Sequence, residues 1–577
     1  QIYLNTWHGT PLKGLGRSIM DAPNSIGNAQ RNFLMTDYLL SPNVYTFDIL
    51  RNDYMLTNLY SGKYVLGGYP RNEILFDAAA AKELKARLGF GGKRIAVYMP
   101  TWREKPDDPD AEDPHLQKLI ETLRILDEKA DDDVIVLAKL HHLTAGSVNF
   151  DSYRRIRPFP GFYETYEILA MADCLITDYS SVMFDYASTG RKIVLYAYDE
   201  EEYQNTRSMY TPINTLPFVI TKEPDALIRE VNRMYDYPGY DEAIHDFIEF
   251  DGPDASKKLL DYVFFGEQSE GMRVIEGKSY HNNKENVIIY AGSLLKNGIT
   301  AALKSLTSVI DADKRNYILL FYAGAVNRNR MTIHDFSRYS YMPIQGERIM
   351  TYGESFCQFL YYYFSLDTKF IRHQLKAIYE REVQRLFCGI HIDYFIHYSG
   401  YERKIMSLMI NIDCKKAIYI HNNLIQEANT RDNIHVKSVE ECYEKCDKLV
   451  AIREGMDKEL LFSNDSVKDK LCLAHNPIDY KSILERARMP LAFDEDTEST
   501  VSAEQLEAII DDQSVTKFIN IARFSPEKGL DRLIDAFEIT NSLHKDSKLI
   551  IIGGHGVLYE QILEKAQKSV CHDDIVV

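Results

Sequence analysis

Short apolar runs alternate with longer amphipathic stretches along the chain. The runs are rich in Val, Ile and Leu, which is typical of strands buried on both faces of a parallel sheet. A turn and a helical pattern follow each run, so the alternation predicts α/β layers built from doubly wound, Rossmann-type parallel sheets. In the first part of the chain the predicted strands lie at residues 63–68, 93–100, 133–140, 173–178 and 192–198.

Changes in polarity predict the domain boundaries. Residues 1–265 form a first module, in which 1–60 are the end of a preceding acceptor-side domain with its crossover and 60–265 are a nucleotide-binding domain. The remaining segments are a polar linker at 266–285, an acceptor-side Rossmann-like domain at 286–485, an acidic insertion at 486–513 and the start of a donor-binding domain at 514–577.

The two ends of the sequence both resemble strands. The chain opens on QIYLNTWHG and closes on DDIVV, so we expect a fragment truncated at both ends. Neither a signal peptide nor an apolar run long enough to span a bilayer is present in these residues.

The net charge and the cysteine content of the chain indicate which binding partners and which cell compartment to expect. The formal net charge of −18 argues against a nucleic-acid binder, because such proteins present an excess of Lys and Arg. The eight cysteines are scattered, which favours reduced thiols and a cytoplasmic location. An acidic protein needs a local basic surface to reach an anionic membrane. The sequence shows no basic helix of that kind, so we expect any peripheral attachment to come from an upstream segment or from partners.

Two histidines follow predicted strands in the first module. His8 lies in NTWHGTPLKGLG, between an apolar strand and a glycine-containing turn, where an imidazole can act as a general base. His141 ends the strand in LAKLHHLTA, with Lys139 on the same face, and strand ends of an open parallel sheet are where ligands bind. His142 is the competing candidate, and a structural role for His8 is the plain alternative.

The segment TDYSSVMFD is the strongest single signal. Hydroxyls and backbone amides at the start of a predicted helix form an anion site, and Asp178 can also cap that helix. Two arginines after turns, Arg71 in GGYPRNEIL and Arg103 in YMPTWRE, suit phosphate contacts, although surface ion pairs are the common alternative. The predicted residues for donor phosphate and nucleotide are Thr177, Asp178, Ser180, Ser181, Asp185, Lys139, Arg71 and Arg103.

Together these motifs resemble the CDP-glycerol:poly(glycerophosphate) glycerophosphotransferases of teichoic acid synthesis, over about residues 1–265. The resemblance implies a GT-B-like fold and transfer of glycerol phosphate from CDP-glycerol to a polymer with release of CMP. It also implies that His8 and His141 are catalytic. A CDP-ribitol donor and a lipid-linked polymer acceptor, at the inner face of a bacterial cell membrane, fit the same motifs. No cofactor is required, although magnesium at Asp178 or Asp185 is compatible with them.

The second half carries a different cluster. Arg523 and Lys528 flank a loop between a strand and a helix in ARFSPEKGLDRLIDAF, and Gly554 follows the next strand in KLIIIGGHG. Two cations on such a loop can clamp a diphosphate. These segments, with NGITAALKSL, resemble the retaining GT-B glycosyltransferases that use nucleotide sugars, over about residues 286–577. The family's glutamate pair lies beyond residue 577, so we expect little glycosyl transfer from these residues alone.

The sequence therefore predicts a transferase built from tandem GT-B-like modules. Two alternatives stay open: an enzyme that mainly transfers sugars and has a degenerate first module, or a non-catalytic scaffold that binds polymer.

Overall fold

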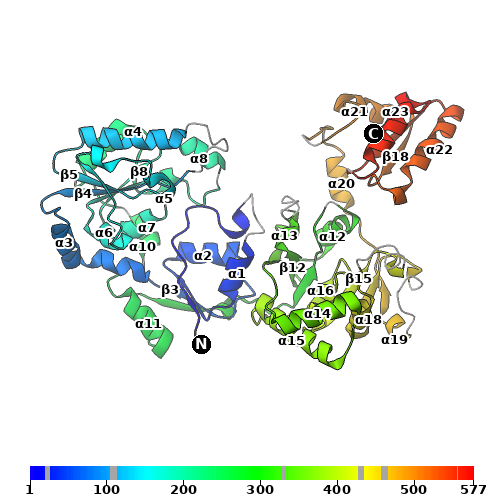
Figure 1. Ribbon diagram of the computed structural model, residues 1–577, viewed down its shortest axis with the longest axis horizontal. Helices are drawn as coiled ribbons and strands as arrows, with labels where there is room; N and C mark the ends of the chain where they lie inside the picture. Colours follow the sequence, from blue (N-terminus) through cyan, green and yellow to red (C-terminus); the bar gives the residue numbers. More distant parts are fainter. Residues whose placement is uncertain are drawn as a thin grey trace. The chain divides into compact units, whose positions relative to one another are not determined.

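The computed structural model describes residues 1–19, 26–103, 113–206, 208–240, 242–295, 297–326, 333, 335–425, 434–456, 465–494, 497–554 and 556–577. The chain divides into two compact units, Gln1–Ile478 and Asp479–Val577. Figure 1 shows alternating helices and strands in both units. The α/β fold class expected from the sequence, with doubly wound parallel sheets, is confirmed. Among the described residues, no helix has both the length and the apolar character needed to cross a bilayer.

A six-stranded parallel sheet organises the first module. Its strand order is β6-β5-β4-β7-β8-β9. Strands β5 and β6 follow one another on one side of β4, whereas β7, β8 and β9 follow one another on its other side, with β7 paired to β4. This is the Rossmann order, and its switch point lies between β4 and β7, where ligands of such sheets bind. The strands are β4 (Arg94–Met99), β5 (Val134–Ala138), β6 (Ile156–Pro158), β7 (Cys174–Thr177), β8 (Lys192–Tyr196) and β9 (Val219–Thr221).

Alternate side chains of this sheet enter two separate cores, one on each face. Ile95 and Val97 pack with α3, α6 and α7, whereas Ala96 and Tyr98 pack with α4 and α9. Asp113 caps α4 through the amides of His115 and Leu116, which fixes where that helix begins. The helices are α3 (Ala78–Arg87), α4 (Pro114–Lys129), α5 (His142–Ala145), α6 (Thr165–Met171), α7 (Val182–Ala187), α8 (Glu200–Thr206), α9 (Pro224–Asn232), α10 (His245–Ile248) and α11 (Ala255–Phe265).

A smaller sheet combines three strands that precede this domain in the chain with one strand that follows it. Its order is β1-β2-β3-β10, with β10 antiparallel to β3. Two sequence expectations change here. The strand expected at 63–68 belongs to this sheet rather than to the nucleotide-binding domain. The segment 266–285, expected to be a polar linker, contains β10. A polar sequence does not reveal that its backbone pairs with a strand. The elements are β1 (Leu4–Asn5), α1 (Gly27–Leu34), β2 (Tyr38–Ser41), α2 (Val44–Asp53), β3 (Lys63–Leu66) and β10 (Arg273–Glu276).

The second module begins with a seven-stranded parallel sheet of order β13-β12-β11-β14-β15-β16-β17, again the Rossmann order. Helix α1 packs against its edge, where Gln30 Nε2 donates to the Tyr341 carbonyl at 3.0 Å. One apolar core therefore joins the small sheet and this sheet. The strands are β11 (Asn286–Tyr290), β12 (Asn316–Tyr322), β13 (Ser340–Ile344), β14 (Tyr394–His397), β15 (Lys415–Ile420), β16 (Lys448–Ala451) and β17 (Leu471–Leu473). The helices are α12 (Gly298–Val309), α13 (Ala323–Val326), α14 (Tyr352–Phe364), α15 (Lys369–Phe387), α16 (Arg403–Met409), α18 (Val436–Lys445) and α19 (Asp465–Lys468).

The second unit has its own core around the parallel sheet β18-β19-β20. Residues 486–513, expected to be an exposed acidic insertion, include α21, and Leu506 of that helix is buried against Ile550 and Val576. Residues 495–496 of that segment lie outside the described residues. The elements are α20 (Tyr480–Arg486), α21 (Ala503–Asp511), β18 (Thr516–Ile521), α22 (Leu530–Leu543), β19 (Ser547–Ile552), α23 (Tyr559–Lys568) and β20 (Ile575–Val576).

Candidate active site

Loops from both sheets of the first module converge at the switch point between β4 and β7. Two adjoining cavities lie there, and Thr101, two residues beyond β4, lines both of them. We call them the His8 cavity and the His141 cavity, after the histidine that each contains. The His8 cavity is formed by the loop 7–15 together with Thr101, Tyr179, Ser180 and Ser181.

The His8 loop is fixed from several sides. Leu12 and Gly14 form backbone hydrogen bonds with Tyr210 and Ser208, and the Asn43 amide donates to the Thr10 hydroxyl at 3.0 Å. A methyl group at Gly14 would come within 2.1 Å of the Ser208 hydroxyl, so glycine is needed for this close approach. These contacts hold a long glycine-containing loop in one conformation.

Arg71 connects this loop to the nucleotide-binding domain. Its Nη1 donates to the His8 carbonyl at 2.8 Å, and its Nη2 donates to the Asp185 carboxylate at 2.8 Å. Partial burial and the neighbouring Arg71 cation both lower the pKa of His8. At neutral pH the imidazole is therefore uncharged and able to accept a proton.

Two serine hydroxyls face the His8 loop from the start of α7. Ser181 occupies the N-cap position but its side chain makes no capping bond to the helix. A Cβ on Gly9 would lie 3.1 Å from the Ser181 Oγ and 3.4 Å from Arg71 Nη2, so the loop backbone passes directly against this hydroxyl. The structure thus brings the sequence-predicted His8, Ser180 and Ser181 into one cavity.

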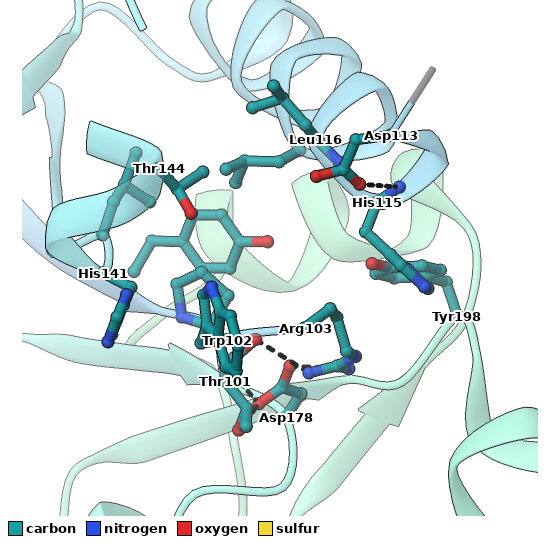
Figure 2. Close-up of a pocket in the computed structure, with 14 residues that line it drawn as sticks. Thr101, Trp102, Arg103, Asp113, His115, Leu116, His141, Thr144, Asp178 and Tyr198 are labelled. Carbon is teal, nitrogen blue, oxygen red and sulfur yellow. Dashed lines mark hydrogen bonds and ion pairs between the residues drawn. The ribbon is translucent and has the colours of Figure 1, made fainter. Parts of the chain in front are cut away.

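Figure 2 shows the His141 cavity, which shares Thr101 with the His8 cavity. The indole ring of Trp102 lies beside the His141 imidazole, with ring centres 5.3 Å apart. Sequence reasoning did not select Thr101, Trp102 or His115, although all three line this cavity. The position of Thr101 and Trp102 directly after a central strand is the signal that could have identified them. The side chain of His142, the competing candidate, lies outside the described residues.

Asp178 and Arg103 line the His141 cavity and hold Thr101, which lines both cavities. The Asp178 carboxylate accepts from the Thr101 amide at 2.8 Å and from Arg103 Nη2 at 3.1 Å, and Asp199 binds the same guanidinium at 2.8 Å. Asp178 is buried, and the N-cap of α7 is Ser181 rather than Asp178. Both side chains therefore hold the loop after β4 against the end of β7, and their charges offset one another.

Asp185 lies beneath the His8 cavity. Its carboxylate is buried and accepts hydrogen bonds from Arg71, Asn72 and the Tyr166 hydroxyl, the last at 2.6 Å. Burial raises the pKa of Asp185, and the Arg71 cation offsets part of that rise. Desolvation likewise raises the pKa of the neighbouring Asp251 to about 7. Asp185 therefore positions Arg71, and through it the carbonyl of His8.

Two further predicted residues act on the strand ends. The Thr177 side chain is buried and its hydroxyl donates to the Met99 carbonyl at 2.7 Å. The Lys139 ammonium contacts the Thr165 hydroxyl and lies 4.6 Å from the centre of the Phe159 ring. Desolvation lowers the pKa of Lys139. These contacts anchor the ends of β7 and β5, which carry the serines and His141.

In the second unit, the predicted donor residues lie on two neighbouring loops. Arg523 and Lys528 are exposed on the loop between β18 and α22. A methyl group at Gly553 would come within 1.9 Å of the Ala522 carbonyl, so the loop after β19 packs directly against this one. Among the described residues, no atom lies within 4 Å of a Cβ placed on Gly554.

Comparison with known proteins decides the family. A family model described as CDP-glycerol:poly(glycerophosphate) glycerophosphotransferase matches residues 1–265. The teichoic acid poly(glycerol phosphate) polymerase of Bacillus spizizenii is 31% identical over 278 residues, which are 45% of this chain and 68% of the relative. The chain belongs to the CDP-glycerol:poly(glycerophosphate) glycerophosphotransferase family.

Two further proteins are similar to this chain over a comparable share of its length. The teichoic acid poly(glycerol phosphate) polymerase of Staphylococcus epidermidis is 30% identical over 283 residues, 46% of this chain, but the match spans only 39% of that relative. The solved structure of the wall teichoic acid polymerase TagF is 29% identical, with 46% of this chain and 68% of TagF covered and a TM-score of 0.40.

Proposed function

We propose that residues 1–265 transfer glycerol phosphate, or a related polyol phosphate, from a CDP-linked donor to a teichoic-acid-like polymer and release CMP. Apart from family membership, one structural observation supports this reaction. An uncharged imidazole, His8, shares a cavity with the hydroxyls of Ser180 and Ser181, and this cavity adjoins a second one containing His141. The two cavities thus combine a proton acceptor for the attacking hydroxyl, His8, with hydrogen-bond donors for the phosphate oxygens.

The chemistry balances without a further reactant. The terminal hydroxyl of the polymer gives its proton to His8 Nδ1 or Nε2 as its oxygen attacks the phosphorus that carries glycerol. The bond between that phosphorus and the bridging oxygen of CMP breaks, and CMP leaves with the electron pair. Ser180, Ser181 and His141 donate hydrogen bonds to the phosphate oxygens and so stabilise the charge that develops on them.

The remaining polar groups position these residues. Arg71 holds the His8 carbonyl, while Asp178 and Arg103 hold the Thr101–Trp102 loop between the two cavities. The indole of Trp102 offers a flat apolar surface beside His141, on which a cytosine ring could stack. The nucleotide end of the donor would then lie in the His141 cavity and the glycerol phosphate in the His8 cavity.

CMP release is the direct test of this function. The full chain should release CMP from CDP-glycerol or CDP-ribitol when a glycerol-phosphate primer is present, and the better donor identifies the polyol. We expect His8→Ala to lower turnover by about 10²–10⁴-fold, the usual cost of losing a general base. Release at the wild-type rate by His8→Ala would refute the role of His8. No release from either donor would favour the sugar-transferring or scaffold alternatives.

We further propose that residues 286–577 form a glycosyltransferase module in which Arg523 and Lys528 bind a nucleotide-sugar diphosphate. The packed loops after β18 and β19 support this, because they bring both cations to the ends of parallel strands. Binding of a UDP-sugar that is lost in Arg523→Ala would support this assignment, whereas equal binding by the variant would contradict it. We also propose that the enzyme works at the inner face of the cell membrane, where a lipid-linked acceptor would be available.

A further inference from the structure

Helix α14 presents aromatic side chains to solvent over its whole length. A capping box of Thr351 and Glu354 starts the helix, and the inner side chains Cys357, Tyr361 and Tyr362 are buried in the core. The opposite side, which we call the outer aromatic face, consists of Tyr352, Phe356, Phe359, Tyr363 and Phe364.

The outer aromatic face is continuous and strongly exposed. Phe356, Phe359 and Tyr363 are 61%, 45% and 67% exposed. The ring of Phe359 lies 5.1 Å from that of Tyr363 and 5.5 Å from that of Phe364, measured between centres. Ile349, Leu366 and Phe370, which are close in sequence to the two ends of the helix, are exposed as well. A contiguous apolar patch of this kind on a soluble domain marks an interaction site.

The apolar character is unusual for a surface helix. Surface helices carry polar and charged side chains on the side away from the core, whereas a helix that is apolar all round is normally buried. The sequence of α14, YGESFCQFLYYYF, contains one charged residue, Glu354, and Arg381 binds its carboxylate at 2.7 Å. The packed core uses one side of the helix, so the other side remains for an external partner.

The surroundings of this face are basic although the chain is acidic. The sequence from Lys369 to Lys376, KFIRHQLK, contains three Lys or Arg residues and a histidine but no acid, in a chain of net charge −18. Three carboxylates lie among these cations: Asp367 and Glu441 both bind Arg372, and Glu380 lies 3.6 Å from the Lys376 ammonium. Lys369, Arg372, Lys376 and Arg403, whose guanidinium lies 5.2 Å from the centre of the Tyr363 ring, outnumber these carboxylates by one. Aromatic side chains with a basic border match the interface of an anionic bilayer.

A second copy of the chain matches this surface less well. A symmetric dimer would place the same patch of each copy against the other, so a basic border would face a like basic border. Anionic lipid headgroups neutralise these cations instead, while the acyl region receives the rings.

We propose that the outer aromatic face of α14, together with Lys369 and Lys376, docks the chain on an anionic lipid bilayer with the helix lying in the interface. This proposal differs from the expectation that residues 1–577 contain no basic helix suited to such a surface, and vesicle binding decides between the two. Periodicity alone does not reveal the face, because the sequence of α14 looks like a fully buried helix. The proposal rests on this surface and does not require that residues 1–265 transfer polyol phosphate.

Vesicle sedimentation of the full chain tests the proposal. We expect the wild type to sediment with vesicles of phosphatidylcholine containing about a third phosphatidylglycerol, and to do so less as salt rises. Each ring that enters the bilayer should contribute about tenfold in partitioning, so Phe356→Ser/Phe359→Ser/Tyr363→Ser should weaken binding by at least about 100-fold. Lys369→Glu/Lys376→Glu should weaken it by about tenfold or more.

Two controls separate insertion from loss of folding. Phe162 is fully exposed in the first module, and Phe162→Ser should bind as the wild type does. Phe359→Trp should be quenched by brominated lipid, whereas Phe162→Trp should not. Unchanged CMP release with a water-soluble primer would show that the triple variant is folded.

Two results would overturn the proposal. One is that the wild type does not sediment with anionic vesicles. The other is that the triple variant binds vesicles normally but no longer forms a dimer that the wild type forms, which would assign the face to self-association. CMP release by a wild type that ignores vesicles would leave the transferase standing and refute membrane docking alone.

Discussion

Removing Arg71 should weaken both the stability and the activity of the first module. The guanidinium bridges the Asp185 carboxylate and the His8 carbonyl, each at 2.8 Å. In Arg71→Met the buried Asp185 charge keeps only its hydrogen bonds from Asn72 and Tyr166. Breaking a fully buried ion pair costs about 3–5 kcal/mol, but Arg71 is 31% exposed, so we expect about 2 kcal/mol.

The pH dependence of this loss has a definite sign. Burial already raises the pKa of Asp185, and loss of the Arg71 cation raises it further. The folded variant then binds a proton that the unfolded chain has released, so its free energy of unfolding falls as pH rises from about 4 through the raised folded pKa. Arg71→Met/Asp185→Asn removes the Asp185 charge and should lose this part of the pH dependence, whereas the buried Asp251, whose pKa desolvation raises to about 7, still contributes its own. It should regain most of the stability but not the activity, because the bond to the His8 carbonyl is still missing.

Tryptophan fluorescence is a suitable assay. The chain has two tryptophans, Trp7 beside His8 and Trp102 beside His141, so the emission reports on the candidate site. A loss of about 2 kcal/mol lowers the urea midpoint by about 1 M when the slope is near 2 kcal/mol per molar. We expect kcat/KM to fall by about 10²-fold, because His8 is no longer held in place. An Arg71→Met variant that Asp185→Asn destabilises further, instead of rescuing, would refute this reasoning.

Four further predictions follow from the same geometry. Because burial and Arg71 lower the pKa of His8, activity should fall with decreasing pH only below about 6.5. Arg71→Met should move this acidic limb of the pH–activity profile to higher pH, and a limb that does not move would argue against His8 as the base. Gly9→Ala places a methyl group 3.1 Å from the Ser181 hydroxyl and should lower kcat/KM at least about tenfold. The control Gly91→Ala, which has no close neighbour among the described residues, should leave kcat/KM unchanged. Equal kcat/KM values for the two variants would contradict the close approach of Gly9 to Ser181. Asp178→Ala removes the carboxylate that holds the Thr101 amide and leaves Arg103 bound to Asp199 alone among its two carboxylates, so donor KM should rise more than kcat falls, as steady-state kinetics would show. Arg523→Ala/Lys528→Ala should leave CMP release unchanged, because these residues lie in the separate unit 479–577.

Much of the fold follows from local pattern. Runs of β-branched residues followed by helical periodicity predicted five strands, and four of them lie in the six-stranded sheet. The strand β3 was assigned to the wrong sheet, since a buried strand does not indicate its neighbours. Strand β10 was missed because its side chains are partly exposed and its partner lies about two hundred residues earlier.

The candidate site was predicted in part. His8, Ser180 and Ser181 were found because each follows a strand, and ligands bind at the carboxyl ends of parallel strands. That His8 follows a strand of the small sheet and the serines a strand of the six-stranded sheet was not predicted. The roles of Asp178 and Asp185 depend on Arg103 and Arg71, which are distant in sequence. The same carboxylate can cap a helix, bind a ligand or hold an arginine, and only the tertiary structure distinguishes these roles.

Transfer of labelled glycerol phosphate tests the central claim most directly. The full chain would be given CDP-glycerol labelled in the glycerol, with a glycerol-phosphate primer, and compared with His8→Asn in the same assay. We predict that the wild type lengthens the primer with stoichiometric release of CMP, and that His8→Asn binds CDP-glycerol but transfers at least about 10²-fold more slowly. A wild type that binds CDP-glycerol and leaves the primer unlabelled, or a His8→Asn variant that transfers at the wild-type rate, would contradict the account.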